Sequence, residues 1–211
     1  MLSVFQYWHV PEPCLEVSQL IATWVSDKAI THRLYSHDSA SAFIKSRFGP
    51  DEVDCWNQCR VPAMQADFFR LCALFEYGGA YVDCDTENLG GLPVLCDSAD
   101  RGVLFMRHGN VANDFMYFAQ PRDRLAAYAL EQAKRNIRSK ASNSVWRVTG
   151  PGIMTHLRNE EPTKWAGLSR GIQLMDVTEV RTIVGFRWDL EYKSGGEHWT
   201  NYKGSIFEMP R

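Results

Sequence analysis

Two aspartates separated by a single residue are the clearest chemical signal in the sequence. Asp83 and Asp85 directly follow Ala80-Tyr81-Val82, a short apolar stretch that is typical of a buried strand. Because side chains alternate along an extended chain, both carboxylates can point the same way. Two converging carboxylates suit magnesium or manganese held jointly with phosphate oxygens. From the residues alone, a pair of solvated aspartates in a turn is the alternative.

A second pair of charged residues precedes this motif. Asp67 and Arg70 are three residues apart, so they share one face of the helix predicted from Pro62 to Tyr77. That helix is otherwise apolar, and charged side chains are seldom buried without a partner. The pattern leaves two interpretations open. The two charges form a local ion pair, or both point into a ligand crevice beside Asp83.

The elements around these residues alternate between strand and helix. The expected order is strand 4–8, helix 15–26, strand 33–35, helix 39–48 ended by Gly49-Pro50, helix 62–77 and strand 80–82. Such alternation indicates an α/β layer fold with a mainly parallel sheet. Ligands of open α/β sheets collect at the carboxyl ends of the strands, where this order places Asp83 and Asp85.

The second half of the chain has weaker patterns. A strand is expected at 102–106 and a helix at 122–139, whose basic end fits the usual placement of cations at a helix C-terminus. Thr149-Gly150-Pro151-Gly152 predicts a turn that leads into another helix. The last fifty residues, rich in Gly, Trp and Tyr, are expected to form loops and short strands.

Composition places the chain among ordinary globular proteins. It has 211 residues, 45% hydrophobic and 23% charged, which excludes disorder and coiled coil and favours one domain over residues 1–211. The net charge of −2 argues against nucleic acid as a partner. The start of the chain lacks signal-peptide features, and no apolar run is long enough to span a membrane. We therefore expect a cytoplasmic protein, at most peripheral at the inner membrane face. In that compartment the six cysteines are expected to be free thiols.

The segment that holds the four charged residues resembles a known family. Ala66-Asp67-x-x-Arg70, followed by Leu74-x-x-x-Gly78-Gly79-x-Tyr81-x-Asp83-x-Asp85, is similar to the sugar-binding DXD region of glycosyltransferase family 32. That family includes bacterial capsular and lipopolysaccharide sugar transferases and yeast mannosyltransferases, and clostridial glucosylating toxins are similar in this region. Further similar segments extend the resemblance from residue 4 to about residue 206: Phe5-Gln6-Tyr7-Trp8, Tyr35-x-x-Asp38, Thr149-Gly150-Pro151, and His198 with Gly204-Ser205.

The resemblance implies a fold and a reaction. The fold would be GT-A, a Rossmann-like sheet flanked by helices in one domain, and the substrate a nucleotide-sugar, UDP-linked rather than GDP-linked. The acceptor would be a saccharide or a lipid-linked saccharide, as in polysaccharide biosynthesis, and transfer would retain the anomeric configuration. Manganese or magnesium would stabilise the departing diphosphate as a Lewis acid. No residue is identifiable as a nucleophile.

The resemblance also implies roles for individual residues. Asp83, Asp85 and Arg70 would be the catalytic residues, with Asp85 as the direct metal ligand and Asp83 between the metal and the ribose. Asp67 and Arg70 would hold the sugar and its phosphate, and Trp8 would stack on the base.

The resemblance implies roles for three further residues. Tyr81 and Ser205 would also contact the donor, and His198 would complete the metal shell. One residue departs from the family pattern. Ile206 stands where the family usually has Trp, which puts the contact of the C-terminal segment with the donor in question.

Two other functions fit the same residues. Val82-Asp83-Cys84-Asp85-Thr86 also resembles the first motif of haloacid-dehalogenase-like phosphatases, although that motif usually opens its domain. A non-catalytic carbohydrate- or protein-binding module on a degenerate transferase fold is the other alternative. The sequence fixes neither the donor base and sugar nor the acceptor.

Overall fold

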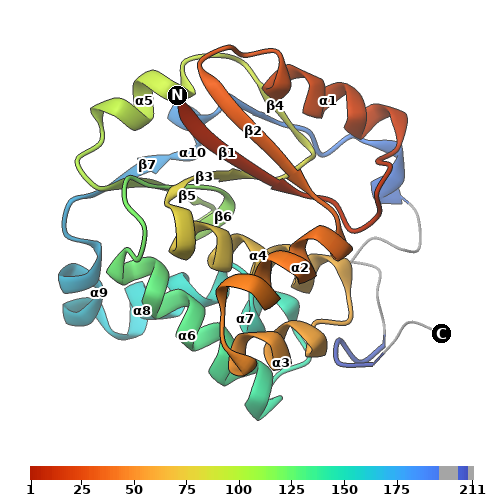
Figure 1. The fold of residues 1–211 in the computed structure, drawn as a ribbon. Helices are drawn as coiled ribbons and strands as arrows, with labels where there is room; N and C mark the ends of the chain where they lie inside the picture. The colour runs from red at the N-terminus through yellow and green to blue at the C-terminus, as the bar shows by residue number, and fades with distance from the viewer. Residues whose placement is uncertain (195–203, 209–211) are drawn as a thin grey trace.

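A six-stranded sheet forms the centre of the molecule (Figure 1). The computed structural model describes residues 1–194 and 204–208. The strand order is β2-β1-β3-β6-β5-β7. The strands are β1 (Leu2–Tyr7), β2 (Ile30–Tyr35), β3 (Gly79–Val82), β5 (Gly102–Arg107), β6 (Asn110–Phe118) and β7 (Ile172–Asp176). Within this sheet β6 runs antiparallel to both its neighbours, and the other pairs are parallel. The predicted mainly parallel α/β sheet is therefore confirmed.

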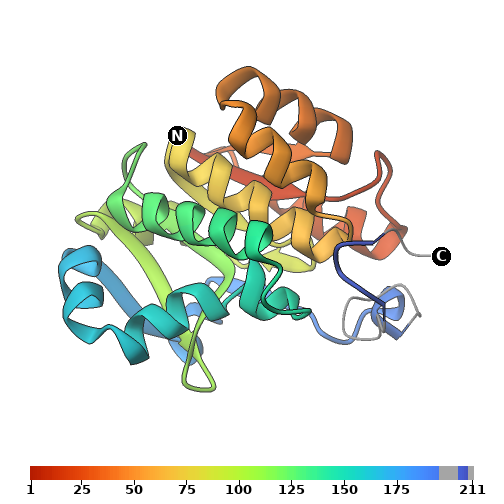
Figure 2. The ribbon, with the colours of Figure 1, turned by 90° about the horizontal axis from the view of Figure 1, so that it is seen from below.

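Helices cover both faces of the sheet, as Figures 1 and 2 show. One face carries α1 (Leu15–Val25), α5 (Leu92–Ser98) and α10 (Val177–Val180), together with a two-stranded sheet of β4 (Thr86–Asn88) and β8 (Val184–Phe186). The other face carries α2 (His37–Arg47), α3 (Pro50–Gln58), α4 (Pro62–Tyr77), α6 (Arg124–Ser139), α7 (Val145–Val148), α8 (Gly152–Glu160) and α9 (Pro162–Ser169). Separate apolar clusters fill the two interfaces, so the sheet lies between two packed layers.

Helix α4 is the element that carries Asp67 and Arg70 into the interior. Its bounds match the predicted helix, and most of its first three turns are buried. Two glycines with positive φ, Gly78 and Gly79, end it and turn the chain into β3. A Cβ on Gly79 would lie 2.7 Å from the carbonyl oxygen of Ser3 in β1. Only glycine lets β3 approach β1 this closely, which fixes the level at which the DXD motif leaves the sheet.

Several predicted boundaries differ from the structure; β2, for example, begins at Ile30 rather than at residue 33. Gly49-Pro50, expected to end a helix, also begins α3, because proline fits the first turn of a helix. The helix expected from residue 122 begins at Arg124, with the Asp123 carboxylate accepting from two backbone amides. The last fifty residues contain α9 besides the expected short strands.

All six cysteines are free, as predicted, and five of them are buried. Over the described part of the chain, no helix combines the length and apolarity that crossing a bilayer requires.

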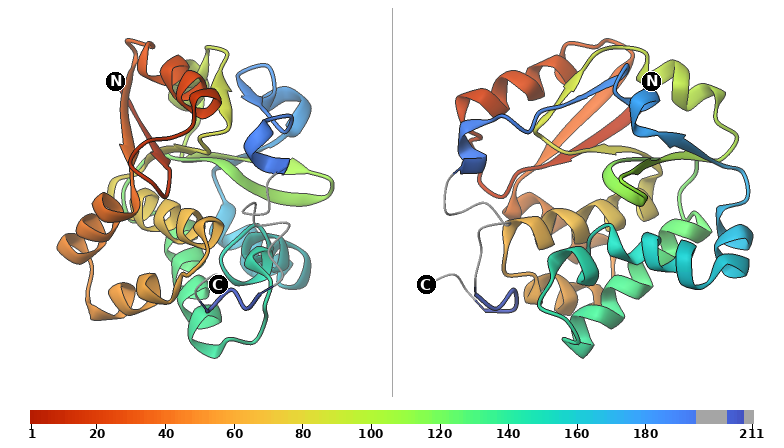
Figure 3. Two further views of the ribbon diagram at one scale, coloured as in Figure 1. Left: turned by 90° about the vertical axis from the view of Figure 1, so that its right-hand side faces the viewer. Right: turned by 180° about the vertical axis from the view of Figure 1, so that it is seen from behind.

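The hairpin of β5 and β6 extends beyond the end of β3. The last residue pair of β3 with β6 is Val82 with Phe115, whereas β6 begins at Asn110 and there pairs only with β5. The hairpin, green in Figure 3, projects from the molecule in the left-hand view. It therefore forms a wall next to the residues that follow β3.

Candidate active site

The main chain of Asp83 is held firmly at the carboxyl end of β3. Its N–H donates to the carbonyl oxygen of Asp114 at 2.9 Å. Its carbonyl oxygen accepts from the Gln6 side chain at 3.2 Å and from the Thr86 hydroxyl at 2.6 Å. Gln6 is fully buried. These bonds fix the backbone of the DXD motif before any ligand is present.

The carboxylate of Asp83 is bonded through one of its oxygens. Oδ1 accepts from the Tyr81 hydroxyl at 2.9 Å and from Arg70 Nη2 at 3.1 Å. Burial raises the pKa of Asp83 to about 7, because the loss of hydration outweighs the attraction of Arg70. Asp83 is therefore not the solvated turn residue of the simple alternative.

Arg70 joins the two groups of the sequence motif. The side chain is 4% exposed, and Nη2 lies 3.1 Å from Oδ1 of Asp67 as well as 3.1 Å from Oδ1 of Asp83. Nη1 donates to the carbonyl oxygen of Asn113, and the guanidinium lies 4.5 Å from the centre of the Tyr81 ring. The local ion pair and the placement beside Asp83 are therefore not alternatives, because the structure contains both.

Asp67 is enclosed by partners from three elements. Oδ1 also accepts from the Asn113 side chain at 2.9 Å, and Oδ2 accepts from the Thr149 hydroxyl at 3.1 Å. The residue is 5% exposed, and burial raises its pKa. A Cβ on Gly150 would lie 3.1 Å from Oδ2, so the Thr-Gly-Pro turn packs directly on this carboxylate. The contacts of Asp67 in the structure are thus internal.

Asp85 faces a different part of the molecule. Its Oδ2 lies 2.5 Å from the Lys193 ammonium group and accepts from the Tyr192 hydroxyl at 3.4 Å. Both residues belong to the 3₁₀ turn η1 (Glu191–Ser194). The Asp85 carbonyl oxygen accepts from the Arg187 N–H at 3.0 Å. The C-terminal part of the chain therefore supplies the surroundings of Asp85.

Trp8 lies beside the motif at the carboxyl end of β1. Its backbone N–H donates to the carbonyl oxygen of Tyr35. Its ring contacts the Tyr192 ring edge to face, with 5.2 Å between the ring centres. The ring packs against a small cluster that includes Cys84 and Leu190. Trp8 is partly exposed, so it is not the plain core aromatic that would leave no room for a ligand.

A fourth carboxylate, Asp114, was not identified from the sequence. It lies on β6 directly opposite Asp83, and its Oδ2 is paired with Arg107. Its Oδ1 is buried and has no hydrogen-bond partner among the described residues. Burial raises the pKa of Asp114. The sequence signal is the polar pair Asn113-Asp114 inside an otherwise apolar strand. Only the pairing of this strand with β3 shows that Asp114 lies next to the DXD motif.

The donor set fits a divalent metal shared with a ligand. Across residues 1–194 and 204–208, no three His, Cys, Asp or Glu side chains form a ready-made metal cluster. Asp83 and Asp85 nevertheless supply hard oxygens, and a cationic group already rests on Asp85. Magnesium and manganese commonly take one or two carboxylates and complete their shell with substrate phosphates. His198, the third expected ligand, lies outside the described residues.

The C-terminal contact residues are placed by Asn143. Its side chain donates to the carbonyl oxygen of Gly204 at 3.1 Å and accepts from the Ile206 N–H at 2.9 Å. Ile206 is 4% exposed and belongs to the main core. The hydroxyl of Ser205 accepts from the Phe207 N–H at 3.3 Å. The residue that departs from the family pattern is thus an anchor in the core.

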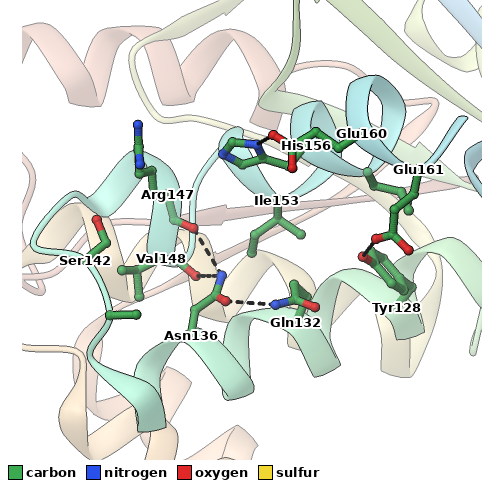
Figure 4. Close-up of a pocket in the computed structure, with 12 residues that line it drawn as sticks. Tyr128, Gln132, Asn136, Ser142, Arg147, Val148, Ile153, His156, Glu160 and Glu161 are labelled. Atoms are coloured by element: carbon green, nitrogen blue, oxygen red, sulfur yellow. Dashed lines mark hydrogen bonds and ion pairs between the residues drawn. The ribbon is translucent and has the colours of Figure 1, made fainter.

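A cavity of about 370 Å³ lies elsewhere, between α6, α7 and α8 (Figure 4). None of the residues expected to bind donor or metal lines it. Figure 4 shows that the Asn136 amide bridges the carbonyl oxygens of Arg147 and Val148, both at 3.1 Å. Asn136 thereby fixes α7, which leads into the turn that contacts Asp67. The cavity is therefore distinct from the candidate active site, to which its lining residue Asn136 contributes only by holding α7.

Comparison with known proteins decides what this arrangement belongs to. Residues 16–100 match the sequence model of the family described as "Glycosyltransferase sugar-binding region containing DXD motif". The matched segment contains Asp67, Arg70, Asp83 and Asp85. The chain thus carries the sugar-binding region of a DXD glycosyltransferase.

Structural comparison agrees on the fold. The solved structure of the PaToxG glycosyltransferase superposes on the glycosyltransferase described here with a TM-score of 0.54, covering 98% of this chain and 85% of that chain at 12% identity. No curated protein matches the chain in sequence. The family match favours the glycosyltransferase over the phosphatase.

Proposed function

We propose that this glycosyltransferase is metal-dependent and transfers a sugar from a nucleotide-sugar, UDP-linked rather than GDP-linked, to a saccharide or other acceptor. The observation that carries the proposal is the position of Arg70. It bridges Asp67 and Asp83 at the sheet edge where Asp85 also lies. A buried guanidinium between two carboxylates is a fixed cation next to a hard-oxygen site, which suits the oxygens of a sugar diphosphate.

The chain's own residues divide the donor between them. Trp8 takes the base beside β1, and Asp83 takes the ribose and the metal. Arg70 and Tyr81 lie within hydrogen-bonding distance of Asp83 and would contact the donor from these positions. Asp67 orients Arg70 through their ion pair, and Ser205 approaches from the C-terminal segment.

A divalent metal, when bound by Asp83, Asp85 and His198, supplies charge neutralisation for the leaving diphosphate. Asp83 must be ionised to serve it, and its raised pKa makes this sensitive to pH near neutrality. Retention of configuration is proposed from the resemblance to glycosyltransferase family 32. Polysaccharide biosynthesis is the corresponding biological setting.

Thermal stabilisation tests the proposal without knowledge of the acceptor. A ligand that binds only the folded state raises the melting temperature. We expect a UDP-sugar with Mn²⁺ to raise it, and EDTA to abolish the effect. Slow release of UDP from the same donor should accompany binding. Stabilisation by no nucleotide-sugar, or release of phosphate from p-nitrophenyl phosphate, would contradict the proposal.

A further inference from the structure

A ladder of aromatic rings and guanidinium groups borders the DXD motif. We call it the Trp188 platform; its members are Phe105, Phe186, Trp188, Arg107 and Arg181. The Phe186 ring stacks on Phe105 at 5.3 Å and on Trp188 at 6.1 Å, the latter with 6° between planes. Trp188 is 50% exposed, which is unusual for so large a side chain.

The two arginines of the platform differ in their partners. The Arg107 guanidinium lies 5.4 Å from the Trp188 ring and is neutralised by Asp114. The Arg181 guanidinium lies 4.9 Å from the same ring. Within the described ranges no carboxylate pairs with Arg181, and its side chain is exposed. The platform thus offers an aromatic surface with one guanidinium that no acid among the described residues neutralises.

The platform is tied directly to the DXD motif. The residue before Trp188 donates its N–H to the carbonyl oxygen of Asp85 at 3.0 Å. On the other side, Arg107 binds Asp114, whose carbonyl oxygen accepts from the N–H of Asp83. Two separate connections therefore hold the platform against both aspartates of the motif.

The strand order places the platform opposite Trp8. Along the sheet the sequence of strands is β1, β3, β6 and β5. The residues at this edge follow the same order: Trp8 after β1, Asp83 after β3, Asp114 in β6 and Arg107 at the end of β5. If the base occupies Trp8 and the diphosphate lies at the DXD motif, the platform borders the free end of the donor sugar. An acceptor must approach from that side.

We infer that the Trp188 platform is the acceptor subsite and that it takes a saccharide carrying a carboxylate. The inference rests on the proposed function. The flat Trp188 ring matches the C–H face of a pyranose, and the Arg181 guanidinium matches a uronate or sialate carboxylate with two parallel hydrogen bonds. Arg107, already neutralised, positions the ring.

A glycan array with neutral, uronate-containing and sialate-containing oligosaccharides tests this directly. The wild type should be retained on carboxylated glycans. Trp188→Ala should lose retention roughly tenfold, and Arg181→Ala should lose the preference for carboxylated over neutral glycans by a similar factor. Arg135→Ala, which removes an exposed arginine from the remote helix α6, is the matched control and should bind as the wild type does.

Donor hydrolysis separates this inference from the proposed function. Trp188→Ala and Arg181→Ala should release UDP from a UDP-sugar at the wild-type rate, with KM for the captured acceptor raised and kcat for transfer little changed. Trp188→Phe, which keeps a ring, should recover most of the acceptor affinity. Equal retention by all variants, or retention of no glycan by the wild type, would overturn the inference. Glycan retention without hydrolysis of any donor would leave the subsite standing and contradict the proposed function.

Discussion

The ammonium group of Lys193 lies 2.5 Å from Oδ2 of Asp85, the carboxylate expected to ligate the metal. The same ammonium donates to the carbonyl oxygen of Arg187, and the neighbouring Tyr192 ring packs on Trp8. The turn η1 therefore contacts both the metal-ligand candidate and the base-stacking candidate. The Lys193 ammonium group thus balances the negative charge of Asp85.

Replacing Lys193 is predicted to strengthen metal binding. In Lys193→Ala a divalent ion no longer competes with the ammonium group for Asp85, so Mn²⁺ affinity should rise roughly three- to tenfold, the size of one partly exposed ion pair. Electron paramagnetic resonance of free Mn²⁺ measures this without nucleotide. Lys45→Ala, on the exposed side of α2, serves as the control. Unchanged affinity in both variants would show that Lys193 does not compete for this site.

Asp85→Asn is predicted to abolish metal-dependent donor binding and leave the fold intact. The side chain is partly exposed at a strand end, and the amide keeps its shape while losing its charge. Melting temperature without ligand should stay close to that of the wild type, and stabilisation by UDP-sugar with Mn²⁺ should disappear. Asp97→Asn, at an exposed aspartate in the last turn of α5, should behave as the wild type. Retained Mn²⁺-dependent stabilisation in Asp85→Asn would remove Asp85 from the metal site.

Arg70→Lys is predicted to reduce both donor binding and stability. Lysine keeps the positive charge but lacks the planar guanidinium fork that reaches Asp67, Asp83 and the Asn113 carbonyl from one position. Because the group is buried, we expect a loss of roughly 1–3 kcal/mol in the free energy of unfolding. Urea denaturation and UDP release measure the two effects. Arg158→Lys on α8 is the control, and full donor turnover in Arg70→Lys would assign Arg70 to structure alone.

Metal binding is predicted to weaken as the pH falls below neutrality. Burial raises the pKa of Asp83 to about 7, so about a tenth of this carboxyl group is ionised at pH 6. Mn²⁺ affinity should therefore drop roughly tenfold between pH 8 and pH 6. An affinity that is flat across this range would show that Asp83 is already ionised at pH 6.

The raised pKa of Asp83 also makes the free energy of unfolding depend on pH. The sign of this dependence is opposite to that of a carboxylate whose pKa is lowered by folding. The folded-state pKa lies above the unfolded value near 4, so the native state holds a proton that the unfolded state releases between those limits. The contribution of Asp83 to the free energy of unfolding therefore falls as the pH rises from about 4 to about 7. Denaturation of the metal-free protein at both pH values checks this, with Asp83→Asn removing the slope.

Local patterns in the sequence predicted the first half of the fold well. The alternation of strand and helix, the apolar α4 and the double glycine placed Asp83 and Asp85 at the carboxyl end of a strand, as observed. Strand β6 was missed, because Asn113 and Asp114 interrupt its apolar pattern and a tight turn at Gly109 joins it to β5. Such a strand is defined by its neighbours rather than by its own residues.

The surroundings of the motif could not be predicted for the same reason. Lys193 reaches Asp85 from the far end of the chain, and Arg107 reaches Asp114 across a hairpin. Neither contact follows from spacing along the sequence, because both depend on how β6 and β8 are packed. The resemblance to the family supplied the charged residues of the motif, and the fold supplied their partners.

One peptide bond in β6 separates the two halves of the site. Asn113 and Asp114 are consecutive residues of a strand, so their side chains point to opposite faces of the sheet, one to Asp67 and the other to Arg107. A shift of this strand by one residue would exchange the two faces completely. If the proposed donor and acceptor sites are correct, both depend on the register of this one strand. An insertion in the hairpin at Gly109 that disturbed the register would then disable both sites at once rather than alter one of them.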